Sequence, residues 1–70
     1  ADTEIKEIQQ AIRNTEASLA SQLITLNLLE SLFNAGLIDL VQVDEFRQNI
    51  ETERATLLRS QVAYQDALEP

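Results

Sequence analysis

The side chains that could perform chemistry in this sequence are carboxylates and one phenol. Twelve acidic residues are present, and their close pairs are Glu4 with Glu7, Asp44 with Glu45, and Glu51 with Glu53. Paired carboxylates can share a proton in acid–base catalysis or hold a hard cation. Tyr64, the single tyrosine, could donate a proton. A catalytic or metal site would have to be built from these groups.

The residues that usually complete such sites are missing. The chain has no His and no Cys, so neither a Glu-x-x-His di-metal motif, a zinc site of the Cys/His kind nor a nucleophile–base pair can form. The residues around Gly36 do not include the alternating Asp and Asn ligands of a calcium loop. We therefore predict no enzyme activity, no cofactor and no metal, with the carboxylates on solvated helix faces.

Length and charge restrict the partners. A single small domain of 70 residues without disulfides is expected to self-associate or to belong to a larger body. The formal net charge of −7 opposes binding to nucleic acid or to an anionic lipid surface. No apolar run approaches the ~20 residues that span a bilayer. The chain begins with Ala and shows no signal peptide, from which we expect a processed product or an excised piece.

The apolar pattern predicts two long helices joined at the single central glycine, Gly36. Before it, the pattern alternates by three and four at Ile5, Ile8, Ile12, Thr15 and Leu19. After it, the pattern recurs at sevens at Val43, Ile50, Leu57 and Tyr64. Because Tyr64 shares this stripe, we place it in a core or an interface. Between residues 19 and 33 the stripe broadens, which indicates more than one neighbouring helix.

The helix ends carry their own signals. Asp2 or Thr3 is predicted to cap the first helix. The stretch 34–36 (Asn-Ala-Gly) is a stop signal, because Gly tolerates the left-handed conformation that ends helices. Pro70 is predicted to follow the end of the second helix.

The second helix has three start signals within six residues. Asp39 is predicted to be its N-cap, with Gln42 completing a capping box, and Ile38 and Val43 occupy the two positions of a hydrophobic staple. We predict helices over 3–34 and 40–68 and a turn over 35–39. The fold class is therefore all-α: residues 1–70 form one long antiparallel two-helix coiled-coil hairpin, part of a larger helical barrel or bundle.

The turn is unusually apolar for the end of a rod. Leu37, Ile38, Leu40 and Val41 crowd this position, whereas turn tips are normally polar. Two readings remain open here. Either these side chains tuck back under the staple, or the tip is a contact surface for a partner.

Two stretches of the sequence resemble the TolC-like outer-membrane efflux proteins, or outer membrane factors. Residues 34–43, Asn-Ala-Gly-Leu-Ile-Asp-Leu-Val-Gln-Val, resemble the periplasmic turn between two very long helices of that family. Residues 44–68 resemble its return helix, with an Arg/Gln-rich start and an Ala-Tyr-x-x-Ala-Leu ending. One position departs from the family pattern, since Gln42 stands where the family often has Asp.

The resemblance implies a homotrimeric channel with a β-barrel in the bacterial outer membrane and a helical tunnel across the periplasm, in drug efflux or type I secretion. This hairpin would lie in the periplasm, outside the membrane, and its turn would dock a periplasmic adaptor (membrane fusion) protein. The residues that match the docking motif are Ala35, Gly36 and Leu37, followed by apolar Ile38, Leu40 and Val43. The alternative is a free-standing antiparallel coiled-coil interaction or scaffold module that self-associates into a four-helix bundle.

Overall fold

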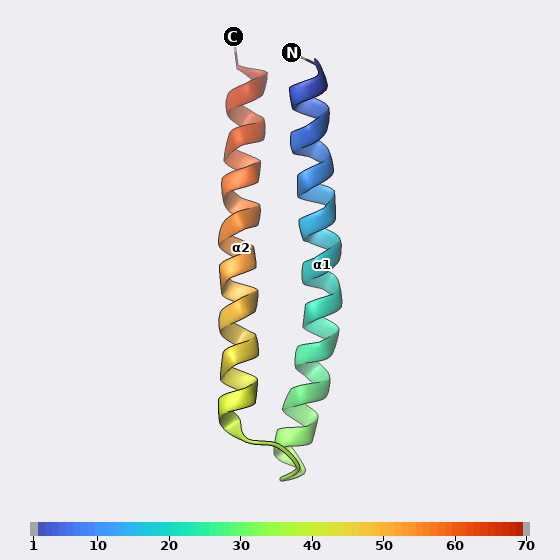
Figure 1. Ribbon diagram of the computed structural model, residues 1–70, viewed down its shortest axis with the longest axis vertical. Coiled ribbons are helices and arrows are strands. Elements are labelled where there is room, and N and C mark those ends of the chain that lie inside the picture. Colours follow the sequence, from blue (N-terminus) through green and yellow to red (C-terminus); the bar gives the residue numbers. More distant parts are fainter. Residues whose placement is uncertain (1, 70) are drawn as a thin grey trace.

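The chain folds into two antiparallel α-helices joined by a short turn (Figure 1). A computed structural model describes residues 2–69, with α1 spanning Asp2–Asn34 and α2 spanning Leu40–Leu68. Both chain ends lie at one end of the hairpin and the turn lies at the other. The all-α hairpin prediction is confirmed, and no strand is present within residues 2–69. The rod measures 54 × 15 × 11 Å between Cα atoms along its principal axes.

The core is the line along which α1 and α2 pack, which we call the seam. Its buried residues are Leu19 on α1 and Val43 and Ile50 on α2. The remaining members of the predicted stripes are only half-buried, namely Ile5, Ile8, Ile12, Thr15, Leu57 and Tyr64. Two helices cover each other along one side only, which explains the partial burial. The radius of gyration is accordingly 16.1 Å, against about 11 Å for a compact domain of this length.

Polar side chains interrupt the seam near its middle. Ser18 and Gln22 on α1 and Glu53 and Ser60 on α2 are half-buried at seam positions. Gln22 Nε2 donates hydrogen bonds to Ser18 Oγ at 3.1 Å and to the Glu53 carboxylate across the seam. Glu53 therefore corrects the prediction that the paired carboxylates all lie on a solvated face.

The observed helix ends differ from the prediction only at the start of α1. Asp2 is already helical, so the assignment of Asp2 or Thr3 as its cap is wrong, and Ala1 lies outside the described residues. At the other end α2 stops at Leu68, and Glu69 adopts an extended backbone with φ −80° and ψ 139°. This conformation is the one that a residue preceding proline prefers. Pro70 itself lies outside the described residues.

The start of α2 has the predicted capping box. Asp39 is the N-cap, with extended φ −84° and ψ 150°. The Asp39 N–H donates to Gln42 Oε1 at 3.1 Å, which is the Gln42 half of the box. The Gln42 N–H also donates to the backbone carbonyl of Asp39 at 3.2 Å. Ile38 is half-buried and Val43 is buried, in agreement with a hydrophobic staple. These contacts fix where α2 begins and therefore how the two helices are aligned.

Candidate functional site

The turn is built on a Schellman motif that ends α1. The Gly36 N–H donates to the Phe33 carbonyl at 2.9 Å, and the Leu37 N–H donates to the Leu32 carbonyl at 2.9 Å. Gly36 has φ +76°, in the left-handed region that favours glycine. A Cβ placed on Gly36 would meet nothing within 4 Å. The backbone of Gly36 is therefore open to approach from outside.

The apolar residues of the tip are largely exposed. Leu37 keeps 71% of its surface in contact with solvent and Val41 keeps 60%. In a Schellman motif the residue at the Leu37 position frequently packs back on the helix that it follows. Leu37 does not pack in this way, and it is the most exposed of the large hydrophobic residues at the tip. Leu40 at the start of α2 and Phe33 near the end of α1 are also exposed.

The predicted docking residues fall into two groups. Ala35, Gly36, Leu37 and Leu40 are exposed at the tip, and Ile38 is half-buried beneath it. Val43, by contrast, is only 1% exposed and belongs to the seam. A partner could not reach Val43 without separating the helices, so its place in the structure is core and not contact surface.

A charged cluster lies on the helices just above the tip. Arg47 donates to Glu30 across the seam at 2.9 Å and to Asp44 on its own helix at 3.3 Å. The hydrogen bond to Glu30 raises the pKa of Arg47 above its ordinary value, and the charges of Glu30 and Asp44 add to this effect. The cluster joins α1 to α2 next to the turn. Below it, Asp39 is the one charged residue between residues 31 and 43, and its capping role accounts for it.

Comparison with known proteins gives no match: no family model matches the chain, and no significant similarity to a curated protein or to a solved structure was found. Within the described residues, no helix has the length and apolar character needed to cross a membrane.

Exposed apolar residues also lie along the sides of the rod. Ile24 is 73% exposed, and it is joined by Leu28 on α1 and by Leu58 and Val62 on α2. The broad apolar stretch predicted before the turn is thus present, but much of it faces away from α2. The chain exposes 5200 Å² in all, compared with about 4,400 Å² expected for a compact monomer of its mass.

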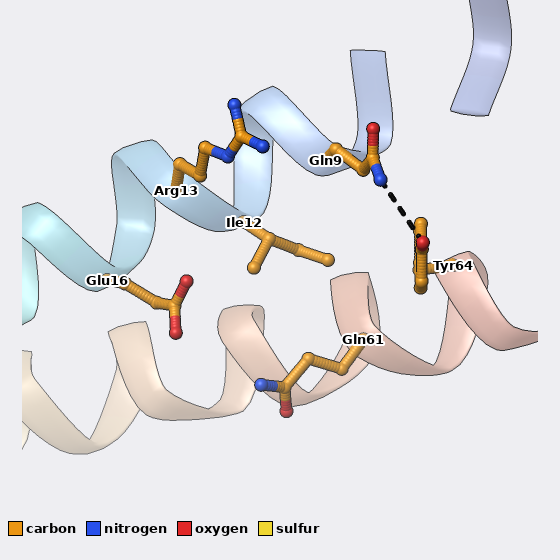
Figure 2. Close-up of a pocket in the computed structure, with 6 residues that line it drawn as sticks. All are labelled: Gln9, Ile12, Arg13, Glu16, Gln61 and Tyr64. Carbon is orange, nitrogen blue, oxygen red and sulfur yellow. Dashed lines mark hydrogen bonds between the residues drawn. The ribbon is translucent and has the colours of Figure 1, made fainter. Parts of the chain in front are cut away.

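A groove opens between the helices near the chain ends (Figure 2). It has a volume of about 300 Å³ and is lined by Gln9, Ile12, Arg13, Glu16, Gln61 and Tyr64. Gln9 Nε2 donates to the Tyr64 hydroxyl at 3.1 Å across the seam. Tyr64 thus lies half-buried with its hydroxyl paired, as expected for a seam residue. The groove brings together no nucleophile with a base.

The remaining carboxylates show no arrangement for metal binding. Among residues 2–69, no group of three or more acidic side chains could hold a metal ion. Glu51 instead forms an ion pair on the surface of α2, with its Oε1 atom 3.2 Å from Arg54 Nη1. The absence of enzyme activity and of a cofactor stays a prediction from the sequence.

Proposed function

We propose that this chain is the periplasmic tip hairpin of a trimeric outer-membrane efflux or secretion channel of the TolC-like kind, and that its turn docks an adaptor protein. The observation that carries the proposal is the exposed apolar tip. Leu37, Leu40 and Val41 present apolar surface at the end of a 54 Å rod. Exposed apolar surface usually marks a partner, and the tip is one of the places where this chain has it. The resemblance of residues 34–43 to the periplasmic turn of TolC-like proteins indicates an adaptor protein as that partner.

The mechanism of docking is tip-to-tip packing of helical hairpins. The open face of Gly36 lets a partner backbone come close, since beyond Gly36 and its two chain neighbours no atom lies within 4 Å of where a side chain would begin. Leu37 supplies apolar contact beside it. The Arg47 cluster and the Asp39 capping box hold the two helices and the turn in one geometry while contact is made.

The test uses the full-length parent channel and its cognate adaptor. Leu37→Asp is expected to weaken adaptor docking at least about tenfold while trimers still assemble, because a central apolar contact is replaced by a charge that must be desolvated. Gln48→Asp is the matched control: it adds the same charge at an exposed position on α2, away from the tip. Docking is measured by binding of purified trimers to immobilised adaptor, with trimer assembly checked by size-exclusion chromatography.

Two outcomes would remove the proposal. Unchanged adaptor affinity in Leu37→Asp trimers would show that the tip is not the docking surface. Equal loss of affinity in the control would show that added charge, and not the lost apolar contact, is responsible.

A second candidate function is supported by the exposed sides of the rod. A free-standing hairpin that self-associates into a four-helix bundle would cover apolar residues such as Ile24 and Leu58. Sedimentation equilibrium of the isolated chain separates the two candidates. A stable dimer, in which two chains contribute four helices, favours the scaffold module. A monomer favours the tip hairpin.

A further inference from the structure

The middle of the seam contains a hydrogen-bonded polar layer formed by Ser18, Gln22 and Glu53. Gln22 Nε2 donates to Ser18 Oγ and to the Glu53 carboxylate, so the layer links both helices. It interrupts the seam next to its most apolar part, since the buried side chains of Leu19 and Ile50 lie close by in sequence. Such layers occupy positions where an apolar residue would ordinarily stand.

The polar layer does not serve stability. Gln22 Oε1 is buried and has no hydrogen-bond partner among the described residues. An unpaired buried acceptor is costly, and replacing a polar pair by apolar groups of similar shape is often neutral or stabilising. The layer is not needed for alignment either, because the Schellman motif and the capping box already fix the turn.

The layer does distinguish between two helices and more than two. In the hairpin, Gln22 and Glu53 are half-buried, so water reaches the Glu53 carboxylate from the side of the seam. If a third and a fourth helix packed onto the seam, they would remove that water. The charge of Glu53 would then be buried with the single amide of Gln22 as partner. Burying a charge with so little compensation opposes the larger bundle.

We propose that the polar layer of Ser18, Gln22 and Glu53 keeps the seam two-stranded, and so prevents copies of this chain from packing together through their seams. The inference does not depend on the proposed channel function. Single polar residues at seam positions determine the number of strands in coiled coils, at a cost in stability.

The test replaces the layer in the full 70-residue chain by apolar residues of similar size, as Gln22→Leu with Glu53→Leu. The matched control makes the same two changes at exposed positions outside the seam, as Gln10→Leu with Glu45→Leu. Both variants therefore have equal composition and equal charge. Sedimentation equilibrium over a wide range of concentrations gives the number of chains, and circular dichroism gives the melting temperature.

The wild-type chain and the control are expected to sediment as single chains. The layer variant is expected to melt at a higher temperature and to associate at least about tenfold more tightly than the control. The inference is overturned if the layer variant has the mass of a single chain throughout, or if the control associates equally. A wild-type chain that is already a multimer overturns it too, as does a layer variant that fails to fold.

Discussion

Gly36 allows the backbone of the tip to be tested separately from its side chains. It is held at φ +76°, and a Cβ built there contacts nothing within 4 Å. A substitution by L-alanine therefore introduces a backbone preference without a clash with distant parts of the molecule. L-Ala and D-Ala have the same atoms and hydrophobicity, and they differ in the direction of the methyl group and in whether they favour the observed left-handed backbone.

The expected free-energy changes follow from this geometry. L-Ala in the left-handed region costs about 1–2 kcal/mol, partly offset by about 0.4–1 kcal/mol because alanine restricts the unfolded chain more than glycine does. Gly36→L-Ala should therefore destabilise the hairpin by about 1 kcal/mol, which corresponds to a fall in melting temperature of about 4–8 °C for a chain of this size. D-Ala keeps only the favourable contribution, so it should stabilise by about 0.4–1 kcal/mol.

The assay compares three chains of 70 residues made by chemical synthesis. Thermal and urea unfolding are followed by circular dichroism at matched concentration. The order of stability should be D-Ala, then glycine, then L-Ala. If the L-Ala and D-Ala chains melt together, the left-handed turn at Gly36 does not contribute to stability and the assigned hairpin geometry is wrong.

Three further predictions concern the seam, the charged cluster and the tip. Val43→Ala should cost about 1–3 kcal/mol in urea unfolding because the side chain is 1% exposed, whereas Val41→Ala, two residues away and exposed, should change stability by less than about 0.5 kcal/mol. Arg47→Gln should lower the melting temperature more than Arg59→Gln at low salt, since Arg47 bridges the helices. The difference between the two variants should shrink at high salt, because the cluster is exposed and salt screens its charges. Equal effects of the two substitutions at low salt would contradict the bridging role. Because the folded-state pKa of Arg47 is raised, this contribution should be constant below the ordinary guanidinium pKa and be lost only as pH rises through the folded value. Leu37→Asp should leave the melting temperature of the isolated chain nearly unchanged, because Leu37 is mostly exposed; a large fall would mean that the tip packs on itself.

The helices and the turn were predictable because their signals are local. The capping box of Asp39 and Gln42, and the glycine two residues after the last helical residue of α1, depend only on neighbours along the chain. Helix α2 accordingly begins and ends at the predicted residues, Leu40 and Leu68. The start of α1 was predicted one residue late, because Asp2 and Thr3 both have side chains that favour a capping position although both are helical.

Burial was harder to predict, because it depends on which side of each helix faces the other. Val43 and Leu37 are both apolar and lie near the turn, yet one is buried and the other exposed. The seven-residue repeat of apolar residues in the second helix already indicated that Val43 lies in the seam. The resemblance to the TolC-like family nevertheless placed Val43 in the docking surface. Gln22 was missed, and Glu53 was placed on a solvated face. The alternation by three and four in the first helix, extended past Leu19, reaches Gln22, and a step of three from Ile50 reaches Glu53, a position that the sevens alone do not include.

The distribution of the core bears on the proposed docking at the tip. Val43 and Ile50, the two most deeply buried residues, lie in the half of α2 next to the turn, and Arg47 joins the helices between them. Toward the chain ends the seam is only half-buried, and a groove separates the helices beside Tyr64. Local stability follows buried apolar contact, so the hairpin is firmest where its apolar tip is exposed. A backbone that is already firm needs little further ordering when a partner binds, which favours the proposed docking at the tip over contact along the looser half of the rod.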